Sequence, residues 1–211
     1  MRTYRAALVL LSIAISGCRG AAVDRPPIVQ PGAPGEATRT TTAAAATDLS
    51  QVQHTDADVR FMQGMIAHHT QALEMTTLLR SRTRSDDMRL LAERIDASQT
   101  DEMDFMRAWL RARGADPDAA AAHVHHGMLM PGMLTPDEMA QLAAATGPGF
   151  DRLFLEGMIK HHVGALTMVE ELFATPGAGQ ESEIFAFASD VDADQRIDIR
   201  RMSAMLQELE P

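Results

Sequence analysis

The sequence predicts an all-α protein, a four-helix up-and-down bundle made of two duplicated helical hairpins. The segment FMQGMIAHHTQALEM at 61–75 returns as FLEGMIKHHVGALTM at 154–168, with nine of fifteen positions identical. In both copies apolar residues recur at alternating steps of four and three, the period of packed helices. Two independent hairpin domains are disfavoured, because an isolated hairpin has nothing against which to bury its apolar stripe. No segment convincingly predicts a strand.

The helix ends are predicted from capping residues and from helix breakers. Thr55 opens a variant capping box, Ser85 can cap the next helix, and Thr135 opens a capping box with proline at the first helical position. The turns at 147–149 and 176–179 contain only Gly, Pro and Ala and separate helices. The five helices are expected at about 55–82, 85–114, 135–146, 150–174 and 181–209.

Residues 1–18 predict export. Arg2 and Arg5 precede an apolar run that is too short to span a bilayer. The sequence ISGC at 15–18 resembles a lipobox, in which Cys18 is lipidated and anchors the protein to the periplasmic or extracellular face of the bacterial envelope. An ordinary cleaved signal peptide with an incidental cysteine is the alternative. Because Cys18 is the only cysteine, a lipidated chain has neither disulfides nor thiolate ligands.

The remaining chain divides into a tether and a bundle domain. Residues 19–54 are rich in Ala, Thr, Pro and Gly, so we expect a disordered tether there. The bundle domain is expected at 55–211, with its first repeat at 55–114 and its second at 150–209. A His/Met loop and a short helix occupy the connection at 115–149.

Each repeat carries a histidine pair in an apolar stripe. His68 and His161 fall on the seam itself and should point inward. His69 and His162 lie about 100° further round the helix axis, at the edge of the seam. Because the two hairpins pack together, four imidazoles could converge in one layer, with Met65 and Met158 one turn earlier on their helices.

The second and fifth helices place an acid and an amide in each apolar stripe. If His68 pairs with Gln99 and His161 with Gln195, the hairpin turns fall where helix-breaking residues predict them. Asp96 and Asp192 then lie within reach of the histidine ring N–H groups. Two interpretations stay open: a metal site, or a metal-free hydrogen-bond network that fixes helix register. The supporting partners in either interpretation are Asp96, Gln99, Asp192 and Gln195.

The central connection contains a second His/Met cluster, within the sequence HVHHGMLMPGM. Thioether sulfur favours Cu(I), and imidazole serves Cu(II), Zn or Ni, so a mixed cluster without cysteine suits copper across its redox states. The alternative is a loop whose methionines pack against the bundle. The residues concerned are His123, His125, His126, Met128, Met130 and Met133.

Other classes of function find little support. There is no Glu-x-x-His, His-Glu-x-x-His, phosphate loop, dinucleotide fingerprint or nucleophile elbow, so we do not expect an enzyme. A metal-dependent redox enzyme is the weakest alternative. A formal net charge of -10 argues against nucleic acid as a partner and is compatible with cations. Protein partners are not indicated.

The doubled GMIxHHxxALxM motif, with MPGMLTPDEMAQL between its copies, resembles the bacterial family called domain of unknown function 305. The resemblance covers about residues 55–209. It implies an exported or lipid-anchored four-helix bundle of ferritin-like type, in a family associated with copper binding in the cell envelope. By this likeness the positions that match the repeated motif are Met65, His68, His69, Met158, His161 and His162.

Overall fold

The computed structural model describes four stretches of the chain: residues 28–30, 37–46, 52–120 and 129–209. The chain divides into two units, residues 1–48 and 49–211. Cys18 and the predicted lipobox lie outside the described residues. None of the described helices is long and apolar enough to cross a membrane.

The first unit contains a small antiparallel sheet inside the segment predicted to be a tether. Strand β1 (Ile28–Gln30) pairs with β2 (Arg39–Thr41), with Ile28 opposite Thr41, and a short helix α1 (Ala43–Ala46) follows. The prediction that the chain has no strand is therefore wrong here. Both strands contain β-branched residues, which favour extended backbone, but three residues are too few to show a recognisable alternation.

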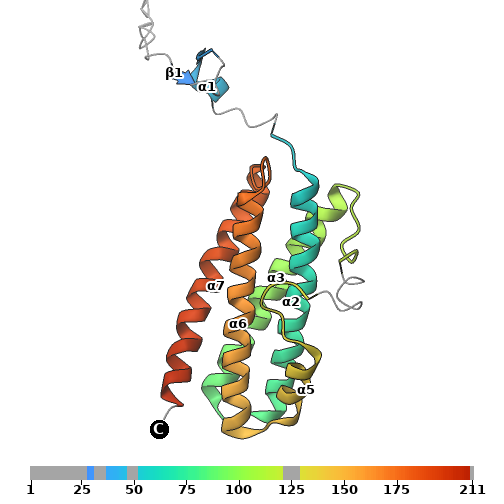
Figure 1. Ribbon diagram of the computed structural model, residues 1–211, viewed down its shortest axis with the longest axis vertical. Coiled ribbons are helices and arrows are strands. Elements are labelled where there is room, and N and C mark those ends of the chain that lie inside the picture. Colours follow the sequence, from blue (N-terminus) through green and yellow to red (C-terminus); the bar gives the residue numbers. More distant parts are fainter. Residues whose placement is uncertain (1–27, 31–36, 47–51, 121–128, 210–211) are drawn as a thin grey trace, which may run out of the picture. The chain divides into compact units, whose positions relative to one another are not determined.

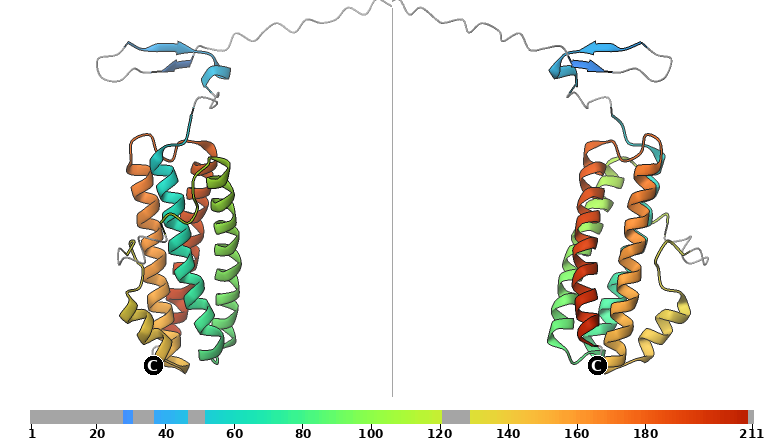
Figure 2. Two further views of the ribbon diagram at one scale, coloured as in Figure 1. Left: turned by 90° about the vertical axis from the view of Figure 1, so that its right-hand side faces the viewer. Right: turned by 60° about the vertical axis from the view of Figure 1, so that its left-hand side comes forward.

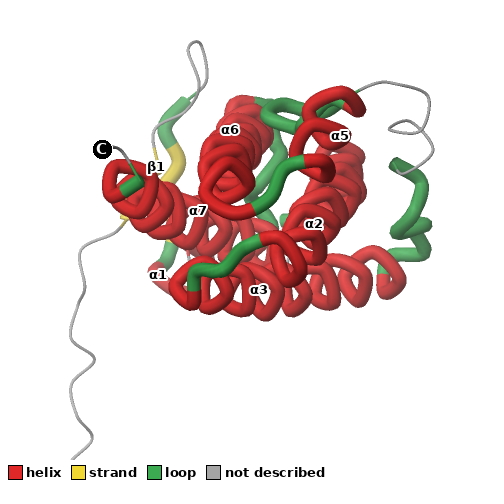
Figure 3. Tube along the Cα trace, turned by 90° about the horizontal axis from the view of Figure 1, so that it is seen from below, coloured by secondary structure: helices red, strands yellow, loops and turns green. Residues whose placement is uncertain are grey.

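The second unit confirms the predicted all-α four-helix bundle (Figure 1). Four long helices enclose the core, and a short helix packs beside two of them, as the view along the bundle shows (Figure 3). All five helices begin and end within about three residues of the predicted positions. They are α2 (Asp56–Arg82), α3 (Asp86–Ala112), α5 (Pro136–Ala144), α6 (Gly147–Ala174) and α7 (Ser182–Glu208).

The helices of each hairpin are antiparallel, whereas α3 and α6 run in the same direction (Figure 2). The connection between α3 and α6, which includes α5, returns along the bundle before α6 starts. This single long crossover is the connectivity of ferritin-like bundles, so the predicted up-and-down order holds within each hairpin but not across the central connection. An ion pair of 2.8 Å between Arg113 and Glu183 joins the end of α3 to the start of α7, so these two helices are also antiparallel.

Capping explains most helix starts. Thr55 and Asp58 form the expected capping box of α2, and Thr135 and Glu138 form that of α5. Helix α6 begins at Gly147, three residues before the predicted start, with Pro148 in its first turn. Proline lacks the N–H that a first turn leaves unpaired. The Gly-Pro-Gly sequence therefore opens the next helix instead of only ending the previous one.

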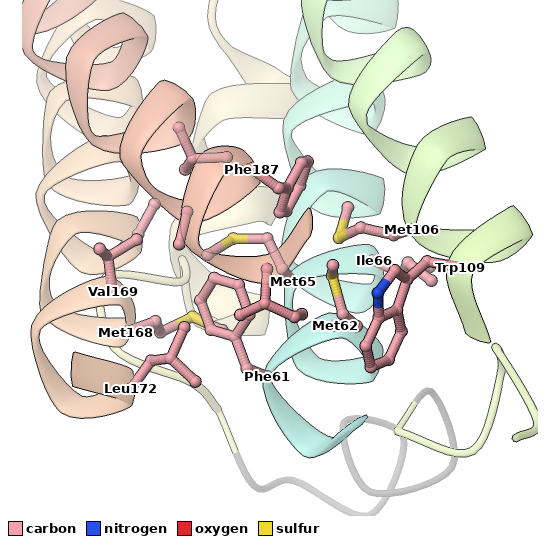
Figure 4. Packing of buried hydrophobic residues seen from close by; sticks show 14 of the residues in the cluster. Phe61, Met62, Met65, Ile66, Met106, Trp109, Met168, Val169, Leu172 and Phe187 are labelled. Atoms are coloured by element: carbon pink, nitrogen blue, oxygen red, sulfur yellow. The ribbon is translucent and has the colours of Figure 1, made fainter. Parts of the chain in front are cut away.

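The bundle core consists of two hydrophobic clusters, one on each side of the histidine layer. One contains Met65, Phe61 and Met168, and its side chains come from α2, α3, α6 and α7 (Figure 4). The other contains Met158, together with Phe154 and Met75. Because α2 and α6 are antiparallel, equivalent residues of the two repeats lie at opposite ends of the core, so the bundle has approximate two-fold symmetry.

Candidate metal centre

The four motif histidines lie together in the middle of the bundle. Their side chains have no solvent exposure. The rings of His68 on α2 and His161 on α6 are nearly stacked, with centroids 3.8 Å apart and planes inclined by 36°. The centroids of His69 and His162 lie 6.3 Å from those of their neighbours in the chain. The structure therefore brings the paired imidazoles of both repeats into one buried layer.

Backbone carbonyls fix the proton positions of the two stacked rings. The Nε2 atom of His68 lies 3.0 Å from the carbonyl oxygen of Pro131. The Nε2 atom of His161 lies 3.0 Å from the carbonyl oxygen of His68. A carbonyl oxygen can only accept, so each ring donates from Nε2 and keeps a lone pair on Nδ1. This tautomer leaves Nδ1 as the ligand atom of a neutral imidazole.

Burial keeps these rings neutral. Burial, assisted by the neighbouring imidazole of His69, lowers the pKa of His68 to about 3. Burial also places the pKa of His161 well below its ordinary value, assisted by His68 and His162. A neutral imidazole is the form that binds metal ions, so His68 and His161 do not need to lose protons before they can act as ligands.

Two carboxylates contact the outer histidines. The Nε2 atom of His69 lies 2.6 Å from Oε2 of Glu102 on α3. The Nε2 atom of His162 lies 3.9 Å from Oδ2 of Asp198 on α7, which is too far for a hydrogen bond. Asp198 instead accepts a 2.9 Å bond from Arg94. Burial alone would raise the pKa of Asp198, but His162 and Arg94 together hold it below its ordinary value.

Glu102 and Asp198 were not found from the sequence, although a signal for them exists. Each lies three residues after the buried glutamine of its repeat, Gln99 or Gln195. The two acids therefore occupy equivalent positions in the duplication. An acid kept in both copies, one turn from a core position, marks a residue that faces the same layer.

The predicted acids Asp96 and Asp192 are not the partners of the histidines. Asp96 accepts a hydrogen bond from Thr76 and pairs with Arg80 at 2.7 Å. Asp192 pairs with Arg196, one turn along its own helix, at 2.9 Å. Pairing residues across a hairpin predicts which layer a residue occupies only to within about one helical turn. A guanidinium is also a stronger partner for a carboxylate than a neutral imidazole is, so both acids pair with arginines.

Several polar atoms of the layer have no hydrogen-bond partner among the described residues. The two glutamines predicted to support the site are buried, Gln99 with 2% and Gln195 with 3% of its surface exposed. Such atoms are rare in native cores and require an explanation. The unpartnered atoms of this layer are the Nδ1 atoms of His68, His69, His161 and His162, Nε2 of His162, and the Oε1 atoms of Gln99 and Gln195.

The predicted methionine ligands lie in different places. Met65 and Met158 are fully buried and lie on opposite sides of the imidazole layer, each one turn from the histidine of its own helix. Met130 and Met133 belong to the described part of the connection, and Met133 is buried with 4% exposure. The remaining predicted loop ligands, His123, His125, His126 and Met128, lie outside the described residues.

The described part of the connection crosses the α2–α6 face and covers His68. Gln71 holds it with two hydrogen bonds, donating to the Leu134 carbonyl at 2.9 Å and accepting from the Leu134 N–H at 2.7 Å. Gly164 occupies the position of Gln71 in the second repeat. A Cβ there would lie 2.6 Å from the Cα of Gly132. One repeat therefore binds the connection and the other makes room for it.

The layer is not a closed coordination shell. Within the described stretches of the chain, no group of three or more His, Cys, Asp or Glu side chains is placed so that it could hold a metal ion. A metal ion binds in the plane of an imidazole, so the stacked rings of His68 and His161 would have to turn about their side-chain torsions to share one ion. The donor chemistry fits a metal, and the ring orientation requires adjustment.

The lowered pKa values predict that the metal-free protein loses stability in acid. Between pH 6.5 and the folded pKa of about 3, the unfolded chain binds protons that the folded chain does not. The free energy of unfolding should therefore fall as the pH falls, by roughly 1.4 kcal/mol per pH unit for each fully buried neutral ring. Urea unfolding from neutral pH to about pH 4 measures this slope.

A double variant with His68→Asn and His161→Asn should show a shallower pH dependence than the unmodified protein. His54→Asn is the matched control, because His54 lies outside the layer, edge-on to Trp109, and this variant should retain the full slope. Parallel pH profiles for the double variant and the unmodified protein would contradict the assignment of the slope to these rings.

Comparison with known proteins identifies one family. The sequence profile described as "Domain of unknown function (DUF305)" matches residues 58–206. A solved protein from Streptomyces coelicolor, described as secreted and as belonging to this family, has 30% sequence identity and a TM-score of 0.62, and the match covers 72% of this chain and 93% of that one. A fragment of this family from Deinococcus radiodurans has 32% identity and a TM-score of 0.62, with 74% and 98% covered.

Solved structures of a protein named CopM are also similar. CopM in its Cu(I)-bound form has 25% identity and a TM-score of 0.58, and the match covers 75% of this chain and 100% of CopM. CopM in its Cu(II)-bound form matches with the same identity and a TM-score of 0.57. No curated protein matches this chain.

Proposed function

The chain belongs to the domain of unknown function 305 family, and from this premise we propose that it is an exported protein that binds or buffers copper in the cell envelope. The ligands are the four histidines of the buried layer with Met65 and Met158 on either side of it, and the histidines and methionines of the central connection contribute to capture. Catalytic turnover is not part of the proposal. Copper is cargo here, held and released through ligand exchange.

The observation that carries the proposal is the set of four buried imidazoles whose Nδ1 atoms lack a hydrogen-bond partner among the described residues. The tautomer fixed by the Pro131 and His68 carbonyls leaves a lone pair on two of these atoms. Imidazole nitrogen suits copper, and thioether sulfur from Met65 and Met158 suits Cu(I). The copper-bound state of CopM, a similar protein, supports the choice of metal.

The partners of Nε2 support a second candidate, a structural bundle with a metal-free polar network. Three ring Nε2 atoms have partners: Pro131, Glu102 and the backbone of His68. A network that served only to fix helix register would be expected to satisfy both nitrogens of each ring. The unpartnered Nδ1 atoms favour the metal-binding interpretation, and metal stoichiometry distinguishes the two candidates.

The proposed location is the bacterial cell envelope, with lipidated Cys18 as the membrane anchor. The similarity to a protein described as secreted supports export, and the lipobox-like sequence at 15–18 supports the anchor. In this arrangement the segment between Cys18 and the bundle sets how far the copper-binding unit can reach from the membrane.

Competition titration of residues 49–211 with Cu(I) and Cu(II) tests the proposal. A variant with His68, His69, His161 and His162 all replaced by asparagine should lose the tight Cu(I) site, because no other described histidine lies in the layer. Circular dichroism at neutral pH should first establish that the variant is folded. His54→Asn is the matched single-histidine control and should bind as the unmodified protein does.

Three outcomes decide between the sites. Equal binding by the fourfold variant and the unmodified protein would rule out the bundle layer. Loss of binding only on deletion of residues 123–133 would assign the function to the connection instead. Failure of both forms to bind either oxidation state would leave the metal-free structural bundle as the supported function.

A further inference from the structure

A cavity lies at the opposite end of the bundle from the turn between α6 and α7. Its volume is about 310 Å³, and it is formed by the start of α3, the start of α6 and the end of α7. This is the end seen from below in Figure 3. Met88, Leu155 and Met205 make its apolar wall, and Leu90 at its margin is 63% exposed. No residue of the imidazole layer lines it.

A buried carboxylate lines this apolar space. Asp151 is only 5% exposed, and its Oδ1 atom has no hydrogen-bond partner among the described residues. No ion pair between described side chains involves it, although Arg201 also lines the cavity. A buried carboxylate oxygen without a donor is costly, so natural cores normally supply one.

The duplication identifies the kind of group that fits there. Asp151 is equivalent to Asp58 at the repeat offset of 93 residues, the separation between His68 and His161. Asp58 is fully buried, and its Oδ1 atom accepts a 2.7 Å hydrogen bond from the backbone N–H of Gly179. The turn between α6 and α7 thus places an N–H donor on this aspartate in the first repeat.

In the second repeat, no described residue places such a donor on the aspartate. The equivalent turn, between α2 and α3, lacks the Pro-Gly-Ala-Gly sequence. There the Ser85 N–H donates to the Thr83 hydroxyl, and the Ser85 hydroxyl caps α3 by accepting from the Met88 N–H. Ser85 and Met88 from this region line the cavity. The cavity therefore occupies the place beside Asp151 that corresponds to the place of the α6–α7 turn beside Asp58. The carboxylate is present in both repeats, but in the second no described residue supplies the N–H donor.

We infer that this cavity is a binding site for a small organic cation that carries an N–H donor on an apolar chain, such as an alkylammonium group. The ammonium takes the place that the Gly179 N–H holds in the first repeat and bonds to Asp151. The charge of the lining favours a cation over a neutral amide, because Asp87, Asp151 and Glu208 face a single cationic residue, Arg201. The apolar wall accommodates the alkyl chain.

Titration of the full chain with hexylammonium, compared with 1-hexanol, tests this inference. Methionine methyl groups labelled with carbon-13 report the site directly, because Met88 and Met205 line the cavity whereas Met65 and Met158 lie in the core. Hexylammonium should shift the signals of Met88 and Met205 saturably and leave those of Met65 and Met158 unchanged. We expect 1-hexanol, which has no charge, to bind about tenfold more weakly.

Asp151→Asn should weaken hexylammonium binding by about tenfold or more and leave 1-hexanol binding unchanged. Asp87→Asn removes the same charge from the exposed margin and is the matched control, with an expected effect of less than about threefold. Equal affinities for the two probes, an Asp151→Asn variant that binds hexylammonium as the unmodified protein does, or no saturable shift of Met88 and Met205 would each overturn the inference. The last outcome needs no variant.

Discussion

Replacing Gly164 by alanine is expected to cost about 3 kcal/mol of unfolding free energy, because the new methyl group meets backbone atoms that cannot yield. The added Cβ would lie 2.6 Å from the Cα of Gly132 and closer still to the carbonyl group of Pro131. Gly132 itself has a positive φ of 74° and contacts the α6 backbone. The connection must therefore leave the helix surface, and Gln71 loses its partner in Leu134.

Gly149→Ala is the matched control for this change. It lies in the first turn of the same helix, and a Cβ there meets nothing within 4 Å. Its effect should stay within about 1 kcal/mol, and alanine's higher helix propensity favours stabilisation. Urea unfolding measures both variants, and limited proteolysis should cut the connection faster in Gly164→Ala alone. Equal stability of the two variants would contradict the close contact between the connection and α6.

Asp58→Ala is expected to destabilise the bundle by about 3 kcal/mol, whereas the equivalent Asp151→Ala should cost less than about 1 kcal/mol. Asp58 accepts hydrogen bonds from the N–H and hydroxyl of Thr55 at 2.6 and 2.9 Å, besides that from Gly179. Its loss removes the Asp58 half of the α2 capping box and leaves the Gly179 N–H buried without a partner among the described residues. Among the described residues, none donates to Oδ1 of Asp151, so its replacement leaves no buried donor unpaired.

Denaturant unfolding at neutral pH compares the two variants directly, because they make the same chemical change at equivalent repeat positions. The slope of unfolding free energy against denaturant should stay the same in both, since neither change alters the surface exposed on unfolding. A cost at Asp151 equal to that at Asp58 would mean that the Asp151 carboxylate has a structural partner that the described residues do not include.

The duplicated apolar stripes were sufficient to predict the bundle and the burial of the histidines. A step of three and four residues fixes which face of a helix packs inward, and that is a local property of the sequence. The same reasoning located the helix caps at Thr55 and Thr135. It missed the start of α6 because Gly-Pro-Gly is compatible with either the end of one helix or the first turn of the next.

The ligands around the layer were harder to predict because they depend on which turn of one helix faces which turn of another. Asp96 lies about one turn before Gln99 on α3 and Glu102 about one turn after it, and only the packing decides which of the two acids meets His69. The role of Gln71 and Gly164 depends on where the connection crosses the bundle. A sequence comparison of the repeats marks these two positions as different, but only the three-dimensional contact explains the difference.

The placement of the connection makes the two sides of the imidazole layer chemically unlike. On the α2–α6 side the Pro131 carbonyl and the Gln71-bound backbone close over His68. On the opposite side α3 and α7 present Glu102 and Asp198, and burial together with these carboxylates raises the pKa of nearby Asp194. If the layer binds copper as proposed, a cation on the α3–α7 side meets these carboxylates before it meets the ring nitrogens, so this side attracts cations more strongly than the backbone-covered α2–α6 side.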